Sequence, residues 1–264
     1  MSHPALQSRI DAALDLAERA GQMAMSMRPA PGSTDATMKG PQDWVTEADG
    51  AVERFLSDEL ADAFPTDGFQ GEEGGISRGG TLRWVVDPID GTSNFARGGA
   101  RFCVSVACLE GDTPLIGIIV APALRETIWA WRGGGGWLNG DAIHAAETST
   151  TQQAIMEVGW SRRRPNAEYI KICERILAGG SGLRHGGSGA LGLADVAIGR
   201  QDRYAELHIN LWDVAAALVI LRESGAKVSD FLSGDGATNG NAIVACGPNL
   251  AASWSDLPGL PRPV

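Results

Sequence analysis

The chain has 264 residues and a hydrophobic share of 44%, which is enough to form the core of one large domain or two joined subdomains. Its 32 acidic residues outnumber its 22 basic residues, and the net charge of -10 argues against nucleic acid or an anionic membrane as the main partner. An anionic small molecule would need local help from metal ions or backbone N–H groups to bind such a chain.

The cysteines and the N-terminal segment indicate the cellular compartment of the protein. The four cysteines form no C-x-x-C pair, and each lies in an apolar or helical segment (Cys103, Cys108, Cys173 and Cys246). Buried, reduced thiols are expected, as in cytoplasmic proteins. The N-terminal segment lacks the apolar run of a signal peptide, and no apolar run reaches the roughly 18 residues of a membrane span. We therefore expect a cytoplasmic protein without a membrane partner.

The first half of the chain changes from helical to strand-like patterns. Apolar spacing predicts a surface helix over residues 5–27, and the Pro and Gly residues of 28–40 predict a loop. Thr46 is expected to cap a second helix that ends near Phe64. From Leu82 onward, short β-type runs predict an antiparallel meander with strands at 83–86, 103–109, 115–120 and 126–131.

The four-glycine run at residues 133–136 favours a tight hairpin over a phosphate cradle. Beyond about Glu147, strands and helices alternate. Helices are expected at 166–178, 190–198 and 211–224, and strands at 154–158, 203–207, 226–228 and 242–246, with 203–207 at an edge. This change of organisation predicts an N-terminal α+β subdomain over 1–145 and a C-terminal α/β subdomain over 146–264.

Residues 84–95 read WVVDPIDGTSNF, so an apolar run is followed by Asp87 and Asp90. We expect the strand to end at Asp87 and Pro88 to turn the chain, so that both carboxylates converge. Two ionised carboxylates repel each other unless a cation lies between them, and Mg²⁺ prefers oxygen ligands. An ordinary Asp-Pro turn, with Asp90 capping Gly91, is the alternative interpretation.

The residues that follow favour the metal interpretation. Gly91, Thr92 and Ser93 form a turn in which successive N–H groups can bind an anion. Carboxylates for a metal beside donors for an oxyanion are what phosphoryl transfer requires. Two further acidic segments fit this pattern: G-E-E at 71–73 and Asp213 in the first turn of an apolar helix. For Asp213, stabilisation of the helix dipole is the alternative role.

The chain resembles the inositol monophosphatase family of Mg²⁺-dependent, lithium-sensitive phosphatases. The motifs that carry the resemblance occur in order over nearly the whole chain: DWVTEAD at 43–49, GEE at 71–73, WVVDPIDGTSNF at 84–95 and LWDVAA at 211–216. The resemblance implies the layered αβαβα sugar-phosphatase fold of the α/β (α+β) class. It also implies a homodimer that acts on a small phosphate monoester.

The resemblance further implies roles for individual residues. Two or three Mg²⁺ ions are expected, with most of their ligands in the N-terminal subdomain: Glu72, Asp87, the carbonyl of Ile89, Asp90, Asp213 and, at a weaker site, Asp49. Asp49 and the Thr92 hydroxyl are expected to orient the attacking water, and the N–H groups of Gly91 and Thr92 to bind phosphate. The substrate residues are expected to be Asp90, Gly91, Thr92, Ser93, Arg184, Gly187, Ser188, Gly189 and Glu206, with most of the substrate wall in the C-terminal subdomain.

Inositol monophosphate is the expected substrate, hydrolysed by a metal-activated water without a phosphoenzyme. Histidinol phosphate is the main alternative, because Glu206 can pair with an amine as well as accept from hydroxyls. A non-catalytic regulator is a third possibility, since one branch of the family is linked to RNA metabolism, but the complete set of acids argues against it. The basic run Arg162, Arg163 and Arg164 predicts a solvated loop, with a subunit contact or a lip that attracts anions as alternatives.

Overall fold

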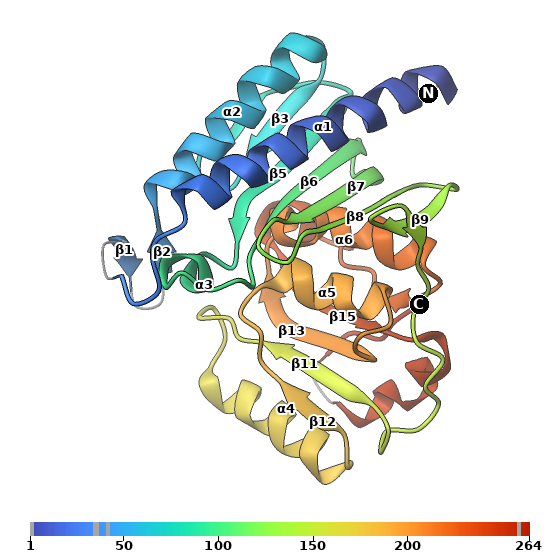
Figure 1. The fold of residues 1–264 in the computed structure, drawn as a ribbon. Helices are drawn as coiled ribbons and strands as arrows, with labels where there is room; N and C mark the ends of the chain where they lie inside the picture. Colours follow the sequence, from blue (N-terminus) through green and yellow to red (C-terminus); the bar gives the residue numbers. More distant parts are fainter. Residues whose placement is uncertain (1–2, 34–36, 41–42, 258–259) are drawn as a thin grey trace.

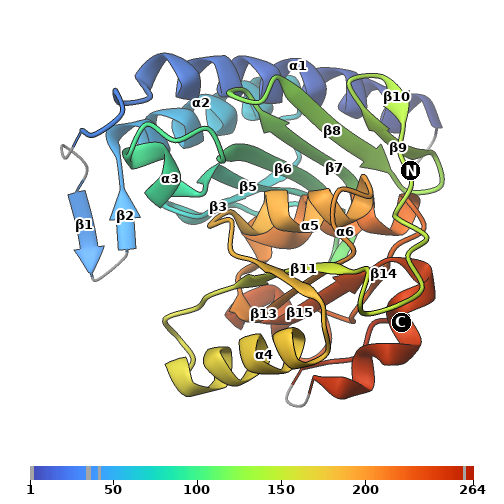
Figure 2. The same cartoon turned by 60° about the horizontal axis from the view of Figure 1, so that its bottom comes forward.

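The structure is a computed structural model that describes residues 3–33, 37–40, 43–257 and 260–264 (Figure 1). Its elements are stacked in five layers, and Figures 1 and 2 show helices on both faces of the larger sheet. The layers are α1 (His3–Met27) with α2 (Glu47–Ala63), a large sheet, α5 (Gly189–Ala197) with α6 (Leu211–Glu223), a smaller sheet, and α4 (Asn166–Ala178) with the 3-10 segment Pro248–Asp256. This arrangement is the expected αβαβα fold.

In the described residues the larger sheet has eight strands in the order β10-β9-β8-β7-β6-β5-β3-β4. Strands β5 to β8 form the predicted antiparallel meander, and β3 pairs in parallel with β5. Helices cover both faces of the central strands, so these strands are apolar on both faces. The bounds are β3 Gly68–Gly71, β4 Gly75–Arg78, β5 Leu82–Asp90, β6 Cys103–Glu110, β7 Thr113–Ala121, β8 Glu126–Trp131, β9 Gly135–Leu138 and β10 Asp141–Ala142.

The smaller sheet has the order β12-β11-β13-β15-β14 in the described chain. The bounds are β11 Ile155–Gly159, β12 Gly182–Arg184, β13 Arg203–Ile209, β14 Lys227–Val228 and β15 Asn241–Cys246. The prediction that residues 203–207 form an edge is wrong, because β13 lies at the centre of the sheet. Its polar residues Tyr204 and Glu206 suggest exposure, but both are buried and hydrogen-bonded to each other.

Short elements account for the other differences from the prediction. The loop expected over residues 28–40 ends in a strand, β1 (Thr37–Gly40), which pairs with β2 (Asp43–Val45). Figure 1 shows this hairpin beside α3 (Thr92–Ala96), at the end of the molecule away from α6. Strands of three or four residues are too short for an alternating apolar pattern to be recognised. A four-residue helix, α7 (Gly236–Asn239), was also not predicted.

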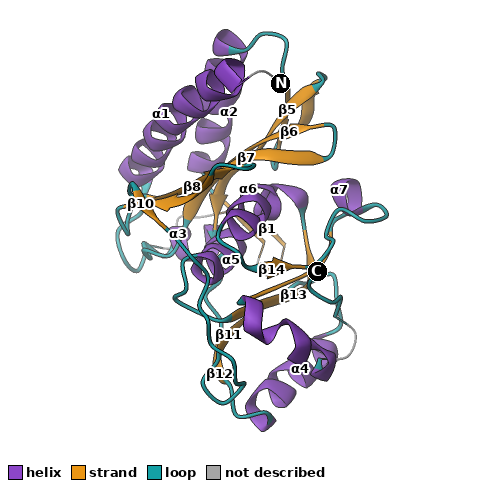
Figure 3. Cartoon of the chain, turned by 90° about the vertical axis from the view of Figure 1, so that its right-hand side faces the viewer, coloured by secondary structure: helices purple, strands orange, loops and turns teal. Residues whose placement is uncertain are grey.

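The buried apolar residues form three clusters in the described chain, and one of them fills the space between the two sheets. Helix α6 is apolar on all sides, and such a helix is stable only where it is covered all round. Figure 3 shows α5 and α6 packed between the larger and the smaller sheet. This core contains residues from both halves of the chain, such as Val85 and Ile243. The division into two subdomains at residues 145/146 therefore stays a prediction. None of the helices in the described part of the chain has the length and apolar character that a membrane crossing requires.

Candidate active site

A bulge near the end of β5 brings its two acids to one side. The strand continues to Asp90, so the prediction that it ends at Asp87 is wrong. Asp87 is opposite Ser105 and Asp90 is opposite Cys103, so β5 carries one extra residue between these pairs. Residues three apart in a regular strand point to opposite faces, and the extra residue places both carboxylates on the same side. Pro88 is tolerated here because the ladder is interrupted.

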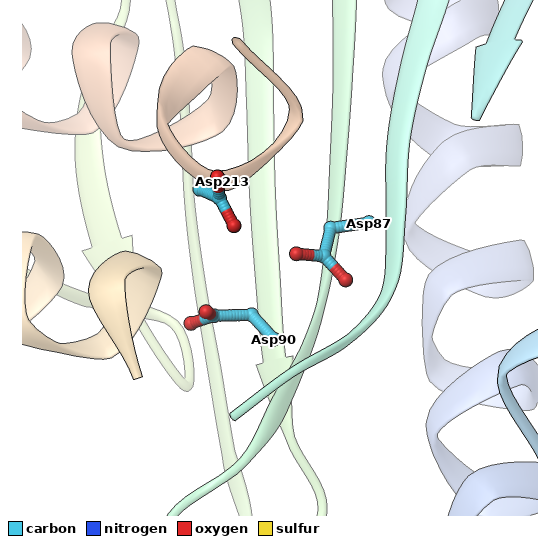
Figure 4. Close-up of side chains that lie close together, drawn as sticks. All are labelled: Asp87, Asp90 and Asp213. Carbon is cyan, nitrogen blue, oxygen red and sulfur yellow. The ribbon is translucent and has the colours of Figure 1, made fainter. Parts of the chain in front are cut away.

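Three aspartates meet at this point. Asp87, Asp90 and Asp213 each offer a carboxylate oxygen, and these oxygens lie within 4.8 Å of one another. Figure 4 shows Asp87 and Asp213 pointing into the same space, with the Asp90 carboxylate turned toward the start of α5. Asp213 lies in the first turn of α6, where its Oδ2 accepts the N–H of Asn210 at 2.9 Å. The bulge and the helix start therefore bring together acids that are more than 120 positions apart in sequence.

Glu72 joins this group from the turn between β3 and β4. Its carboxyl group shares a hydrogen bond with that of Asp87. The turn is held by Glu53 of α2, whose two carboxylate oxygens accept the N–H groups of Glu73 at 2.8 Å and Gly74 at 2.7 Å. Sequence analysis missed Glu53, although a glutamate between Val52 and Leu56 on the buried face of α2 was an available signal.

Glu53→Gln is expected to weaken Mg²⁺ binding about tenfold, because one carboxylate acceptor of the turn becomes an amide donor that faces an N–H group. Activity at saturating Mg²⁺ should change little. Titration of activity with Mg²⁺ measures this effect, and Glu59→Gln, which removes a partly exposed ion pair with Arg19 of α1, is the matched control. An unchanged Mg²⁺ dependence in Glu53→Gln would contradict the proposed support of the turn.

The residues expected to handle the attacking water also lie together here. Asp49 is buried, and its Oδ2 accepts the backbone N–H of Thr46 at 2.8 Å and the Thr46 hydroxyl at 2.6 Å. The Thr92 hydroxyl donates to the carbonyl of Ile89 at 2.8 Å and lies 3.4 Å from Asp49 Oδ1. Gly91 has a φ of 90°, and a Cβ atom at this position would lie 2.8 Å from the carbonyl oxygen of Arg101. Only glycine fits this turn without strain.

Asp90 connects the bulge to α5. Its Oδ1 accepts the N–H of Gly189 at 3.1 Å, and its Oδ2 accepts the N–H of Ala190 at 2.8 Å and the Ser188 hydroxyl. The carboxylate therefore caps α5, and the alternative in which it caps Gly91 is wrong. Oδ1 has a lone pair left for a cation, because a carboxylate oxygen accepts about two bonds.

A cavity of about 270 Å³ opens beside Asp90 and Asp213. This volume is just below the range of roughly 300–1,000 Å³ typical of ligand pockets, so the cavity suits a small metabolite. Four of its lining residues are predicted substrate residues in addition to Asp90 and Glu206: Ser93, Gly187, Ser188 and Gly189. Arg184 lies on the exposed strand β12 and is not part of the cavity wall. Sequence analysis missed other lining residues, among them Trp160, His185 and His208.

Two polar residues that sequence analysis also missed hold the glycine-rich wall in place. The Asn94 amide donates to the carbonyls of Arg101 at 2.8 Å and Gly186 at 2.9 Å. The Arg101 guanidinium bridges Glu157 at 2.7 Å and Asp195 at 2.8 Å. These bonds join the turn after β5 to the strand and helix that carry the wall.

Burial raises the pKa of every acid in the group, and repulsion by neighbouring acids adds to this effect in Glu72, Asp87 and Asp213. Burial has the largest effect on the pKa of Asp87, followed by the charges of Glu72 and Asp213, and raises it well above the usual range. Burial, followed by the charge of Asp90, raises the pKa of Asp213 to about 7. Burial likewise raises the pKa of Glu206 to about 8, against a hydrogen bond from the Tyr204 hydroxyl at 2.7 Å. A cation would relieve this repulsion, and a set of carboxylate oxygens fits Mg²⁺.

A protein-family profile and several known proteins match this chain over most of its length. The profile described as "Inositol monophosphatase family" matches residues 5–256. An inositol-1-monophosphatase of Rhizobium meliloti is 36% identical over 233 residues, which cover 86% of each chain. A "Nus factor SuhB" of Xylella fastidiosa is 37% identical over 199 residues, 75% of this chain and 72% of that protein.

A solved structure agrees at the level of the fold. The structure of the extragenic suppressor protein suhB from Bartonella henselae has a TM-score of 0.87 at 29% identity, covering 94% of this chain and 97% of that one. The layered fold, the ordered motifs and these matches lead to the same assignment. The chain belongs to the inositol monophosphatase family.

Proposed function

We propose that this protein is a Mg²⁺-dependent phosphomonoesterase that hydrolyses inositol monophosphate. The observation that carries the proposal is the convergence of Asp87, Asp90 and Asp213 beside a cavity of metabolite size. Family membership and relatives named inositol-1-monophosphatase support the same activity. The homodimer, the lithium sensitivity and the cytoplasmic location stay predictions.

The acids of the site would hold two or three ions. We assign Glu72, Asp87, Asp90, Asp213 and the Ile89 carbonyl as ligands, with Asp49 at a weaker site. When bound, the ions would lower the pKa of the attacking water and stabilise the leaving alkoxide.

The chain's other groups position the reactants. Asp49 and the Thr92 hydroxyl, 3.4 Å apart, would orient the attacking water. The N–H groups of Gly91 and Thr92 would bind the phosphate, and the wall of Gly187, Ser188 and Gly189 would hold the alcohol part.

Glu206 favours a polyol over an amine as the alcohol part of the substrate. Burial raises the pKa of its carboxyl group to about 8, so burial favours the neutral form over the ionised form. A neutral carboxyl group can both donate to and accept from hydroxyl groups, whereas an ammonium group requires the ionised form. Histidinol phosphate is therefore the second candidate substrate.

A non-catalytic role is a further candidate, because several relatives are named Nus factor SuhB. The complete acid group favours the enzyme. Phosphate release with Mg²⁺, with and without Li⁺, separates the candidates when it is measured on inositol 1-phosphate, histidinol phosphate, fructose 1,6-bisphosphate and adenosine 3′,5′-bisphosphate. Preference for inositol phosphate supports the proposal, preference for histidinol phosphate favours the second candidate, and no metal-dependent release from any of them favours the non-catalytic role.

Glu206→Gln is expected to change substrate selection more than metal binding. The amide keeps the size of the side chain but cannot ionise, so the preference for inositol phosphate over histidinol phosphate should change about tenfold. The ratio of kcat/KM for the two substrates measures this, and the Mg²⁺ dependence serves as the internal control. An unchanged ratio would exclude a role for Glu206 in selection.

A further inference from the structure

Arginines line two cavities of this acidic chain. The basic run at 162–164 is exposed, as predicted for a solvated loop, and Arg162 and Arg163 also line the active-site cavity. A second cavity, of about 260 Å³, lies where the last turns of α6 meet β7 and the end of β8, which Figure 3 shows beside this helix. The second cavity is lined by Thr113, Pro114, Arg132, Val219, Arg222 and Glu223.

The second cavity lies at the opposite end of α6 from the acid group of the active site. Asp213 is in the first turn of this helix, whereas Arg222 is in its last turn. At 1.5 Å per residue, the two positions are about 14 Å apart along the helix axis. A molecule in the second cavity would therefore not compete with the substrate for the acid group.

The acid that lines the second cavity is bound by the glycine run at 133–136. Glu223 Oε1 accepts the N–H of Gly133 and Oε2 accepts the N–H of Gly135, both at 2.8 Å. The run forms the predicted hairpin between β8 and β9. N–H groups of such a turn form a site for an anion, and here the Glu223 carboxylate occupies it. The charge of Glu223 is thus already stabilised by the backbone.

The two arginines of the second cavity lack comparable partners. Throughout the described ranges, neither the Arg132 nor the Arg222 guanidinium has a hydrogen bond or an ion pair, and both side chains are exposed. The backbone N–H of Arg132 donates to the carbonyl of Leu115 at 2.8 Å, which fixes this residue beside β7. Stabilisation of the helix dipole would explain Arg222 alone, but not a second arginine that lines the same cavity.

We propose that the second cavity binds a small organic anion, in which a phosphate or a carboxylate group is attached to an apolar body. A guanidinium presents N–H donors in a planar fork that matches either group, so Arg132 and Arg222 would bind the anionic end. Pro114 and Val219 are buried and apolar, and they would contact the body of the ligand. The volume is just below the usual range for ligand pockets, which suits a small molecule.

Calorimetry on the metal-free protein in EDTA tests the inference with phenylphosphonate, benzoate and inorganic phosphate as probes. None of the three is a phosphate ester, so the proposed activity cannot consume them. Phenylphosphonate or benzoate should bind to wild type, and the tighter of the two identifies the preferred anionic group. Arg132→Gln and Arg222→Gln should each weaken that binding about tenfold or more, because a charge-assisted hydrogen bond is lost. Inorganic phosphate should bind more weakly than phenylphosphonate, because it has no apolar body.

Arg175→Gln is the matched control, because Arg175 is the basic residue in the last turn of α4, as Arg222 is in α6. This variant should bind the probes as wild type does. No binding of phenylphosphonate or benzoate by wild type would refute the site, as would equal affinity in wild type and both cavity variants. An equal loss in Arg175→Gln would reduce the effect to general charge. The test involves no catalysis, so its outcome is separate from that of the proposed function.

Discussion

Asp90→Asn is expected to lower Mg²⁺-dependent phosphate release by about a thousandfold or more, because it removes an anionic ligand from the acid group. The carboxylate of Asp90 converges with those of Asp87 and Asp213 to within 4.8 Å between oxygens. An amide keeps the shape but has no charge and only one acceptor oxygen. Single-turnover and steady-state phosphate release at saturating Mg²⁺ measure the loss.

Asp90 also caps α5, so the loss of activity must be separated from loss of folding. In the variant, an amide nitrogen would face the donors of Ser188 or Ala190. Asp87→Asn is a second variant without this complication, because its carboxylate accepts the N–H of Ile89 and no α5 donor. Asp112→Asn, in an exposed ion pair with Arg83, is the control. Near-normal activity in folded Asp90→Asn and Asp87→Asn would exclude the metal assignment.

The metal-free protein is expected to lose stability as the pH rises from about 4 to about 8, and Mg²⁺ is expected to restore it. The pKa of Asp213 rises from its ordinary value of 3.8 to about 7, mainly through burial, and that of Glu206 from 4.5 to about 8 for the same reason. At a pH between the ordinary and the raised pKa of each residue, the folded state binds more protons than the unfolded state. Stability therefore falls with increasing pH in this window.

Mg²⁺ reverses the effect because it binds the ionised acids of the folded state. The gain in melting temperature on adding Mg²⁺ should be larger at pH 8 than at pH 5, by at least about 5 °C. Thermal unfolding at both pH values, with EDTA or with Mg²⁺, measures this difference. Asp213→Asn should flatten the pH dependence without metal, whereas Asp112→Asn should leave it unchanged. A gain that is equal at both pH values would contradict the proposed ion site.

The regular elements were predictable because their signals are local. Helix α4 begins and ends at the predicted residues, and α6 differs from its prediction by one residue. The strands of the meander follow short apolar runs between turn residues, as predicted. Apolar period and capping residues depend on neighbours a few positions away, so a single sequence contains them.

Several parts of the site were not predictable, because their partners are distant in sequence. Glu53 of α2 holds a turn 20 residues away, and Asn94 reaches the carbonyl of Gly186 across 92 positions. The central position of β13 depends on pairing with β11 and β15 on its two sides. No local pattern around these residues specifies which distant segment they contact.

The sequence alone determined the acids that the motifs contain, and the family resemblance carried by these motifs predicted the order of the layers. The tertiary structure decided how these acids meet: the bulge in β5 places Asp87 and Asp90 on one side, and α6 brings Asp213 to them. It also placed Arg163 in the cavity wall and Arg184 outside it. The physical reason is that convergence of side chains depends on strand register and helix packing, which are fixed only when the whole core assembles.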